Sequence, residues 1–226
     1  GPTAVGKSEV ALLLAERLGG EIISVDSMQV YRGLDIGTAK STATERAHVP
    51  HHLIDVAELN EPFDAAKFCA LAKVAVGEIQ ARGHVPIFCG GTGLYFKAYL
   101  EGLGEAPPAD AKLRAELEAA PLDALLHELA ERDQATFEKI DRQNPRRVIR
   151  AVEVLRLTGK PFSEQRSAWQ NGTRNTPHAS QLFVLTRPKP DLDARINARV
   201  DAMFAQGLVA ETRDLLARGL EQNQTA

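Results

Sequence analysis

Apolar residues recur at helical spacing from Val10 to Leu18, directly after a glycine-containing segment, and the stretch ends at two glycines. This pattern predicts a helix that the chain enters from a loop. A β-branched run over Glu21–Val25 follows and stops at Asp26, which predicts a short strand. Later segments of the same kinds predict two more strands and an Ala-rich helix, over His52–Val56, Val85–Cys89 and Asp64–Arg82 respectively.

The pattern changes after Tyr99, where glycine and proline residues mark a turn and a long stretch of helical spacing follows. We predict that residues 107–180 form an inserted all-helical domain between two parts of one core, residues 1–106 and 181–226. The clearest helix of the insertion begins at an Asn144 cap and ends near Leu157. Its side chains divide into an apolar face and an opposite basic face, made of Val148, Val152 and Leu155 and of Arg146 and Arg150.

The segment after the insertion predicts a return to the core. Residues Gln181–Thr186 have the composition of a strand, which we expect to rejoin the sheet. Two helices are predicted after it, the first ending near Phe204 and the second over Leu208–Arg218. Strands that alternate with helix-length segments are typical of an α/β fold with a parallel sheet.

Composition narrows the class of protein. With 44% hydrophobic and 25% charged residues, the chain has the balance of a folded soluble domain. No apolar run is long enough to span a bilayer and no leader pattern is seen, so we expect a cytoplasmic protein with no membrane partner. Cys69 and Cys89 lie far apart in apolar segments and are predicted to be buried thiols. The pair His51-His52 does not predict a metal site, because adjacent side chains on a strand point to opposite faces.

The charge is unevenly distributed along the chain. A net charge of −3 would by itself disfavour a nucleic-acid partner. Between Arg142 and Arg174, however, eight basic residues stand against two acidic ones, so this segment carries an excess of six positive charges and the remainder nine negative ones. An acidic body with one basic segment indicates a protein that docks a polyanion at a single place.

The segment Gly1-Pro2-Thr3-Ala4-Val5-Gly6-Lys7-Ser8 fits the P-loop pattern G-x-x-x-x-G-K-S, and a predicted helix follows it as the pattern requires. Its backbone N–H groups and the helix N-terminus can surround a diphosphate, Lys7 adds a positive charge, and the Ser8 hydroxyl can hold Mg²⁺. The motif predicts phosphate binding and leaves open which molecule carries the phosphate. The fold class we predict is a P-loop NTPase-like parallel sheet flanked by helices, with the helical insertion.

Two further segments are predicted to lie at the same edge of the sheet. Asp26 ends the first strand, so it should project beside the P-loop, either as a Mg²⁺ ligand, as a general base, or only as a cap of the next segment. The loop Gly90-Gly91-Thr92-Gly93 follows the strand Val85–Cys89. It is either a simple turn into a helix or a second substrate loop in which Thr92 makes the polar contact.

Taken together, several strings in the chain closely resemble the tRNA dimethylallyltransferases. They are the P-loop, Ile23–Ser27, Val30–Lys40, Gly90–Tyr95 and Asn144–Arg150. The resemblance covers nearly the whole chain and includes the helical insertion. By comparison with the family pattern, the chain starts on the first glycine of the P-loop, without the strand before it, and ends before a later segment with Arg and Tyr. We therefore expect a fragment at both ends.

The resemblance implies a prenyl transfer to RNA. The dimethylallyl group would pass from dimethylallyl diphosphate to N6 of the adenosine on the 3′ side of the anticodon, position 37 of the tRNA, giving N6-dimethylallyladenosine and diphosphate. Residues Gly1–Ser8 would hold the diphosphate with Mg²⁺, Asp26 would be the base, and Thr92 would bond in the same pocket. A base is useful because the lone pair of the N6 amine is delocalised into the ring. The adenosine would have to leave its stack to reach the pocket.

The family likeness also implies residues that contact the anticodon stem-loop of the tRNA. They are Asp26, Ser27, Met28, Gln29, Thr92, Arg114, Arg146, Arg147, Val148, Ile149 and Arg150. For the last run, the basic face of the predicted helix is an independent reason. Nothing in the sequence requires more than a monomer.

Three alternative functions share parts of this pattern. A small-molecule or nucleotide kinase would use the same P-loop and sheet, with lid arginines closing on ATP, but would not need the segment Asp26–Lys40 in this form. A non-catalytic RNA-binding module with a relic P-loop would have no reason to keep Lys7, Ser8 and Asp26 together. Enzymes that prenylate free adenine nucleotides have less use for a basic inserted domain.

Overall fold

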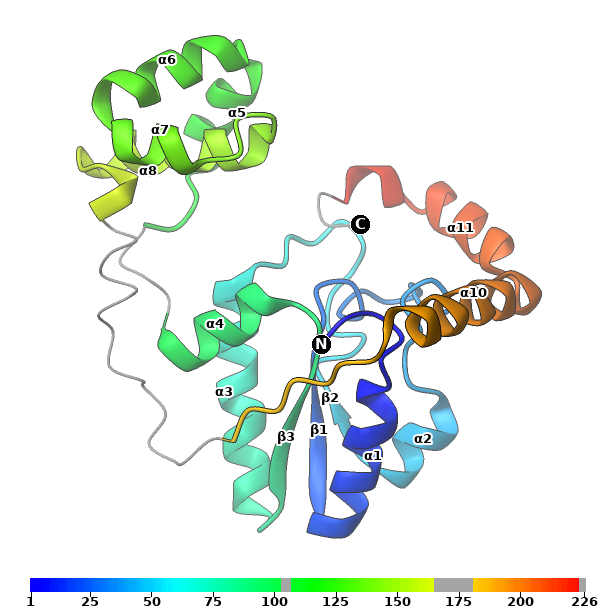
Figure 1. The fold of residues 1–226 in the computed structure, drawn as a ribbon. Coiled ribbons are helices and arrows are strands. Elements are labelled where there is room, and N and C mark those ends of the chain that lie inside the picture. The colour runs from blue at the N-terminus through cyan, green and yellow to red at the C-terminus, as the bar shows by residue number, and fades with distance from the viewer. Residues whose placement is uncertain (103–106, 165–180, 224–226) are drawn as a thin grey trace. The chain divides into compact units, whose positions relative to one another are not determined.

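The structure is a computed structural model that describes residues 1–102, 107–164 and 181–223. The chain forms two compact units (Figure 1). The first consists of Gly1–Tyr99 together with His178–Ala226, and the second of Leu100–Pro177. No helix in the described part of the chain is long and apolar enough to cross a membrane.

The first unit is built around a parallel sheet of order β2-β1-β3. β1 (Gly20–Val25) is central and pairs with β2 (His51–His52) and along its whole length with β3 (Val85–Gly90). All six residues of β1 are buried. Helices α1 (Lys7–Leu18) and α3 (Ala65–Ala81) pack against β1 and β3, and Figure 1 shows them on either side of the sheet. This arrangement confirms the predicted α/β class with a helix-flanked parallel sheet.

Local signals set the ends of these helices. α1 ends at Gly19, which has a left-handed φ of 61°, and its inward residues Ala11 and Ala15 form a core cluster with Ile22 of β1. The Asp64 carboxylate caps α3 by accepting a hydrogen bond of 2.8 Å from the Lys67 amide. Two shorter helices complete this half of the unit, α2 (Ala43–His48) and α4 (Gly93–Glu101).

The strand predicted over His52–Val56 is wrong beyond its first residue. β2 ends at His52, and the chain then turns through Leu53 and Asp55 at positive φ angles of 62° and 57°. The turn is held by the Asp55 carboxylate, which accepts hydrogen bonds from Lys40 (2.5 Å) and Arg46 (2.8 Å). These ion pairs outweigh the β preference of the local sequence.

The strand predicted over Gln181–Thr186 is also wrong. These residues form no strand, and they pair with none of the three strands of the described sheet. The side chains of Leu182, Phe183 and Val184 are 68%, 73% and 67% exposed. A strand needs a hydrogen-bonding neighbour, and an apolar run by itself does not supply one.

The helices after this segment confirm the prediction from spacing. α10 (Lys189–Gln206) and α11 (Leu208–Ala217) are separated by Gly207, and the short helix η1 (Leu220–Gln222) follows. Gly207 has a φ of 104°, a left-handed conformation that favours glycine and breaks the two helices apart.

The second unit contains α5 (Ala111–Ala119), α6 (Leu122–Arg132), α7 (Gln134–Lys139) and α8 (Pro145–Thr158), and its described residues include no strand. Asn144 caps α8 by accepting a bond from the Arg147 amide, as predicted. The apolar face of α8 is buried: Val148 and Val152 are 0% exposed and Leu155 is 1% exposed. Val148 and Val152 pack with Leu117, Leu125, Leu129 and Ala151 in one cluster.

Candidate functional site

The P-loop leads into α1 through Gly6, whose φ of 102° requires the left-handed conformation that glycine adopts without strain. The first turn of a helix leaves backbone N–H groups without intrahelical partners, so this end attracts anions. Lys7 Nζ donates hydrogen bonds to the carbonyls of Gly1 (3.0 Å) and Pro2 (2.7 Å), which places the ammonium inside the curve of the loop. Burial lowers the pKa of Lys7, and the positive charge of Arg199 acts in the same direction.

A cavity of about 970 Å³ opens beside this loop, at the carboxyl ends of β1 and β3. It lies wholly within the first unit. The predicted site residues Gly1–Ser8, Asp26 and Gln29 all line it. Its walls also include residues from β1, the segment after it, the end of β3 and α10, among them Ser24, Asp35, Thr38, Ala39, Lys40, Cys89, Gly90, Gly91, Arg195 and Arg199. A smaller neighbouring pocket of about 420 Å³ is lined by Asp26, Met28 and Thr38, among others.

Asp26 follows directly on β1, so its side chain lies at the rim of the sheet. Its Oδ1 accepts hydrogen bonds from the backbone amides of Met28 (2.9 Å) and Gln29 (3.3 Å). Within the described residues, Oδ2 receives no hydrogen bond. Asp26 therefore caps the next turn with one oxygen, and the second oxygen remains available at the cavity.

Thr92 joins the two loops at this edge of the sheet. Its Oγ1 accepts a hydrogen bond of 3.1 Å from the amide of Ser27, the residue after Asp26. The amides of Gly91 and Thr92 both donate to the carbonyl of Val25 at 3.1 Å. A Cβ at Gly90 would lie 2.1 Å from this carbonyl oxygen, so the close approach of the two strand ends requires glycine there. Thr92 is therefore fixed beside the residue that follows Asp26, but it does not line either pocket, and its carbonyl accepts hydrogen bonds from Tyr95 and Phe96 in the first turn of α4.

Ser8 and Cys89 bring together oxygen and sulfur groups beside the P-loop. The Ser8 hydroxyl and the Asp26 carboxylate line the same cavity, and oxygen donors of this kind suit Mg²⁺. Cys89 is half-buried, so the prediction of a buried thiol is confirmed only for Cys69. Burial raises the pKa of the Cys89 thiol, which keeps it neutral and less reactive.

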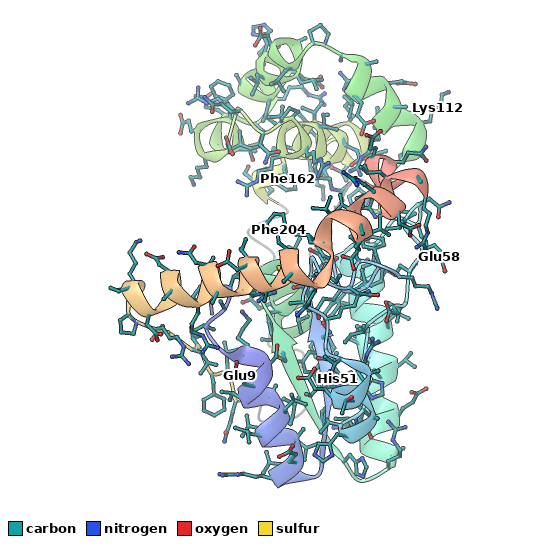
Figure 2. All side chains as sticks on the ribbon, turned by 90° about the vertical axis from the view of Figure 1, so that its right-hand side faces the viewer. Glu9, His51, Glu58, Lys112, Phe162 and Phe204 are labelled. Atoms are coloured by element: carbon teal, nitrogen blue, oxygen red, sulfur yellow. The ribbon has the colours of Figure 1, made fainter. Side chains whose placement is uncertain are left out.

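Three arginines near the P-loop were not anticipated. Arg195 Nε donates to the carbonyl of Ala4 at 2.8 Å, and Arg187 Nε donates to that of Val5 at 2.9 Å. Arg195 also pairs with Glu9 at 2.9 Å, and Figure 2 shows α10 lying across the start of α1, where Glu9 is labelled. Arg199, one turn further along α10, lines the cavity. The four-residue spacing of Arg195 and Arg199 was the available signal, but it does not reveal which part of the chain the pair faces.

In the helical unit, the residues expected to contact tRNA fall into two groups. Arg146 and Arg147 are exposed at the start of α8, where the helix N-terminus adds to their positive charge. Val148 is fully buried in the core of the unit and Ile149 is half-buried, so the exposed cations carry the surface of this run.

Arg114 and Arg150 instead surround Glu153, a carboxylate that is 0% exposed. Arg114 Nη2 and Arg150 Nη1 donate to Glu153 Oε2 at 2.8 and 2.6 Å, and the Asp110 amide donates to Oε1 at 3.0 Å. Arg150 also donates to the carbonyl of Pro107 at 2.6 Å. A buried carboxylate is tolerated when it is paired and hydrogen-bonded in this way. Arg150 thus belongs to an internal ion cluster, whereas Arg146 on the same helix is exposed.

The two histidines of β2 have separate partners. His51 Nδ1 lies 2.7 Å from the carbonyl of Val49 and its Nε2 lies 3.0 Å from Ser41 Oγ, whereas His52 pairs with Glu21 at 2.6 Å. Burial lowers the pKa of His51. Across residues 1–102, 107–164 and 181–223, no group of three or more His, Cys, Asp or Glu side chains is arranged to hold a metal ion.

Comparison with known proteins places this chain in a family. The family described as IPP transferase matches residues 29–226. The chain is 49% identical to tRNA dimethylallyltransferase 1 of Trichlorobacter lovleyi, over 97% of this chain and 73% of the relative. It is 50% identical to the tRNA dimethylallyltransferase of a Roseiflexus species, over 97% of this chain and 72% of the relative.

Solved structures agree with this assignment. The full-length tRNA isopentenylpyrophosphate transferase of Bacillus halodurans is 41% identical with a TM-score of 0.62, covering 100% of this chain and 71% of its own. A eukaryotic dimethylallyltransferase acting on tRNA is 30% identical with a TM-score of 0.80, covering 96% of this chain and 55% of its own. The chain therefore belongs to the IPP transferase family.

Proposed function

We propose that this protein transfers the dimethylallyl group of dimethylallyl diphosphate to N6 of the adenosine directly 3′ of the tRNA anticodon. The products are N6-dimethylallyladenosine and diphosphate. The observation that carries the proposal is a single cavity in which a P-loop faces a carboxylate at the end of the central strand. Relatives about half identical to this chain, named tRNA dimethylallyltransferase, support the choice of donor and acceptor.

The P-loop side of the cavity suits the leaving diphosphate. The backbone N–H groups of Thr3–Ser8, at the start of α1, would bind its oxygens, and Lys7 and Arg199 would supply positive charge. Arg195 holds the loop in shape through its bond to the Ala4 carbonyl. The Ser8 hydroxyl would hold a Mg²⁺ ion, which would supply charge neutralisation of the diphosphate when it is bound.

Asp26 is placed to accept the proton of the acceptor amine. As the N6–C1 bond forms and the C1–O bond to diphosphate breaks, one N6 proton passes to the carboxylate. The electron pair of the broken bond leaves with the diphosphate. Because the two backbone amides hold Oδ1, the carboxylate has one orientation and presents Oδ2 to the incoming base.

The tRNA that carries the target adenosine would contact two sets of residues. The segment Asp26–Gln29 and Thr92 would contact the adenosine, which leaves its stack to enter the cavity. Arg146 and Arg147 would bind phosphates of the anticodon stem-loop, together with the N-terminus of α8. Arg114 and Arg150 would support this surface through Glu153. We expect the protein to act as a monomer in the cytoplasm.

The test follows radiolabel from dimethylallyl diphosphate into unmodified tRNA in the presence of Mg²⁺. Label at the adenosine beside the anticodon is the expected result, with none in a tRNA that carries guanosine there. Absence of transfer, together with tight binding of ATP, would replace this proposal with a kinase.

A further inference from the structure

One carboxylate from the end of the chain holds three consecutive backbone amides near its beginning. Glu211 of α11 accepts hydrogen bonds from the amides of Asp35 (3.1 Å) and Ile36 (2.7 Å) through Oε2, and from the amide of Gly37 (3.0 Å) through Oε1. Successive N–H groups that converge in this way form an anion-binding concavity. Here its anion is a side chain 174 residues away from Gly37 in sequence.

The same face of α11 carries the packing that goes with these bonds. A Cβ at Gly37 would lie 3.2 Å from Leu208 Cδ1, and one at Gly33 would lie 3.3 Å from Leu215 Cδ2. Leu208, Glu211 and Leu215 follow one another at intervals of three and four residues, so they share one side of the helix. The segment 33–37 is therefore seated on α11, with Glu211 at the centre of the contact.

The residues that follow the seated segment are connected to the candidate base, Asp26, through hydrogen bonds of Gln29. Gln29 Nε2 donates to the carbonyls of Thr38 (3.0 Å) and Ala39 (3.3 Å), and Gln29 Oε1 accepts from Ser24 Oγ at 2.8 Å. The backbone amide of the same Gln29 donates to Asp26 Oδ1. Residues 35–40, except Gly37, line the large cavity, and Gly37 lines the smaller one.

We propose that Glu211 is a positioning residue: it fixes residues 35–39 as a wall of the cavity and, through Gln29, sets the orientation of the Asp26 carboxylate. The proposal rests on the transfer reaction proposed above for its kinetic readout. Glu211 touches neither reacting atom. It acts on the rate because a displacement of about 1 Å at a reacting group can cost roughly 100-fold in rate.

The first test compares two carboxylates of α11 in single-turnover transfer. Glu211→Ala removes all three bonds to the loop, and we expect the rate to fall roughly 10- to 100-fold while the affinity for dimethylallyl diphosphate changes less than about threefold. Asp214→Ala is the matched control, because Asp214 is exposed and, among the described residues, its carboxylate pairs only with Arg218 at the end of the same helix, at 3.5 Å. A Glu211→Ala rate equal to that of the control overturns the proposal.

A double variant separates positioning from general destabilisation. In an Asp26→Asn background the carboxylate to be oriented is absent, so adding Glu211→Ala should lower the residual rate by less than about twofold. A loss as large as in the wild-type background overturns the path through Asp26. Glu211→Gln keeps one acceptor oxygen and should give an intermediate rate, which serves the test if the alanine variant does not fold.

Hydrogen exchange tests the contact without any activity. The amides of residues 35–37 should exchange slowly in the wild type and in Asp214→Ala, and at least about tenfold faster in Glu211→Ala. Unchanged exchange overturns the role of Glu211. Wild-type protein that protects these amides but transfers no label would refute the proposed function and leave the contact itself established.

Discussion

The central strand β1 carries a carboxylate at either end, and the two are bonded in opposite ways. Glu21 is 2% exposed and is surrounded by Arg82, His52 and His84, whose nitrogens lie 2.6 to 2.9 Å from its oxygens. Asp26 is less buried and uses one oxygen for two backbone amides. A carboxylate whose oxygens are all bonded to cationic or basic side chains contributes to stability, whereas one with a free oxygen at a cavity can exchange a proton.

The largest effect on the transfer rate is expected from substitution of Asp26. Asp26→Ala should lower the transfer rate by roughly 10²- to 10⁴-fold, because it removes the carboxylate proposed to take the N6 proton. The affinity for tRNA should stay within about threefold of the wild type, since the cationic surface is unchanged. Single-turnover kinetics and equilibrium binding measure the two quantities. An unchanged rate would remove Asp26 from the mechanism.

Substitution of Glu21 should have the reverse effect, a loss of stability with little change in the transfer rate. Glu21→Ala leaves Arg82, His52 and His84 without their shared partner, and we expect it to lower the free energy of unfolding by about 2 kcal/mol. The transfer rate per folded molecule should change less than about twofold, because Glu21 lies at the end of β1 away from the cavity. Chemical denaturation measures the first quantity. A rate loss as large as that of Asp26→Ala would end the distinction between the two ends.

The pH dependence of stability sharpens the same contrast. The Arg82 guanidinium, and then His52 and His84, lower the pKa of Glu21 from 4.5 to about 2. Between these values the unfolded chain binds more protons than the folded one, so this contribution is present above pH 4.5 and is lost as the pH falls towards 2. Glu21→Gln should therefore flatten the acid limb of a plot of unfolding free energy against pH. An unchanged acid limb would show that Glu21 is not responsible for it.

The smallest effects are expected in the helical unit, where exposed arginines can be compared with an arginine that pairs with a buried carboxylate. Arg146→Ala with Arg147→Ala should weaken tRNA binding and reduce the slope of log affinity against log salt by up to about two. Arg150→Ala should instead lower the stability of the unit by about 1 to 3 kcal/mol, because Glu153 loses a partner. Salt titrations of binding and thermal unfolding separate the two. If Arg150→Ala reduced the salt dependence of binding by the same amount, Arg150 would have to contact tRNA phosphates as well.

Much of the fold follows from the sequence because it depends on contacts between near neighbours. The helical spacing after Lys7, the Ala-rich helix that follows Asp64, the Asn144 cap and the break between the two helices after Thr186 are all local signals, and each falls close to where it was predicted. The two strand errors, over His52–Val56 and Gln181–Thr186, both depend on contacts outside the run: the first run gives way to a turn held by the ion pairs of Asp55, and the second pairs with no strand of the described sheet. Whether an apolar β-branched run becomes a strand depends on a neighbouring strand, which the run itself does not specify.

The candidate site divides in the same way. The sequence by itself determined the P-loop, because its residues are consecutive and their spacing already contains the geometry of a phosphate cradle. It also indicated Asp26, because strand ends meet at one edge of a parallel sheet. Only the tertiary structure decided that Arg195 reaches Ala4, that Glu211 seats residues 35–37, and that Arg150 turns to Glu153. The first two contacts join residues that are far apart in sequence and that only the folded chain brings together. Arg150 and Glu153 are one helical turn apart, but the arginine turns inward because burial of the helix leaves the Glu153 carboxylate in need of a cation.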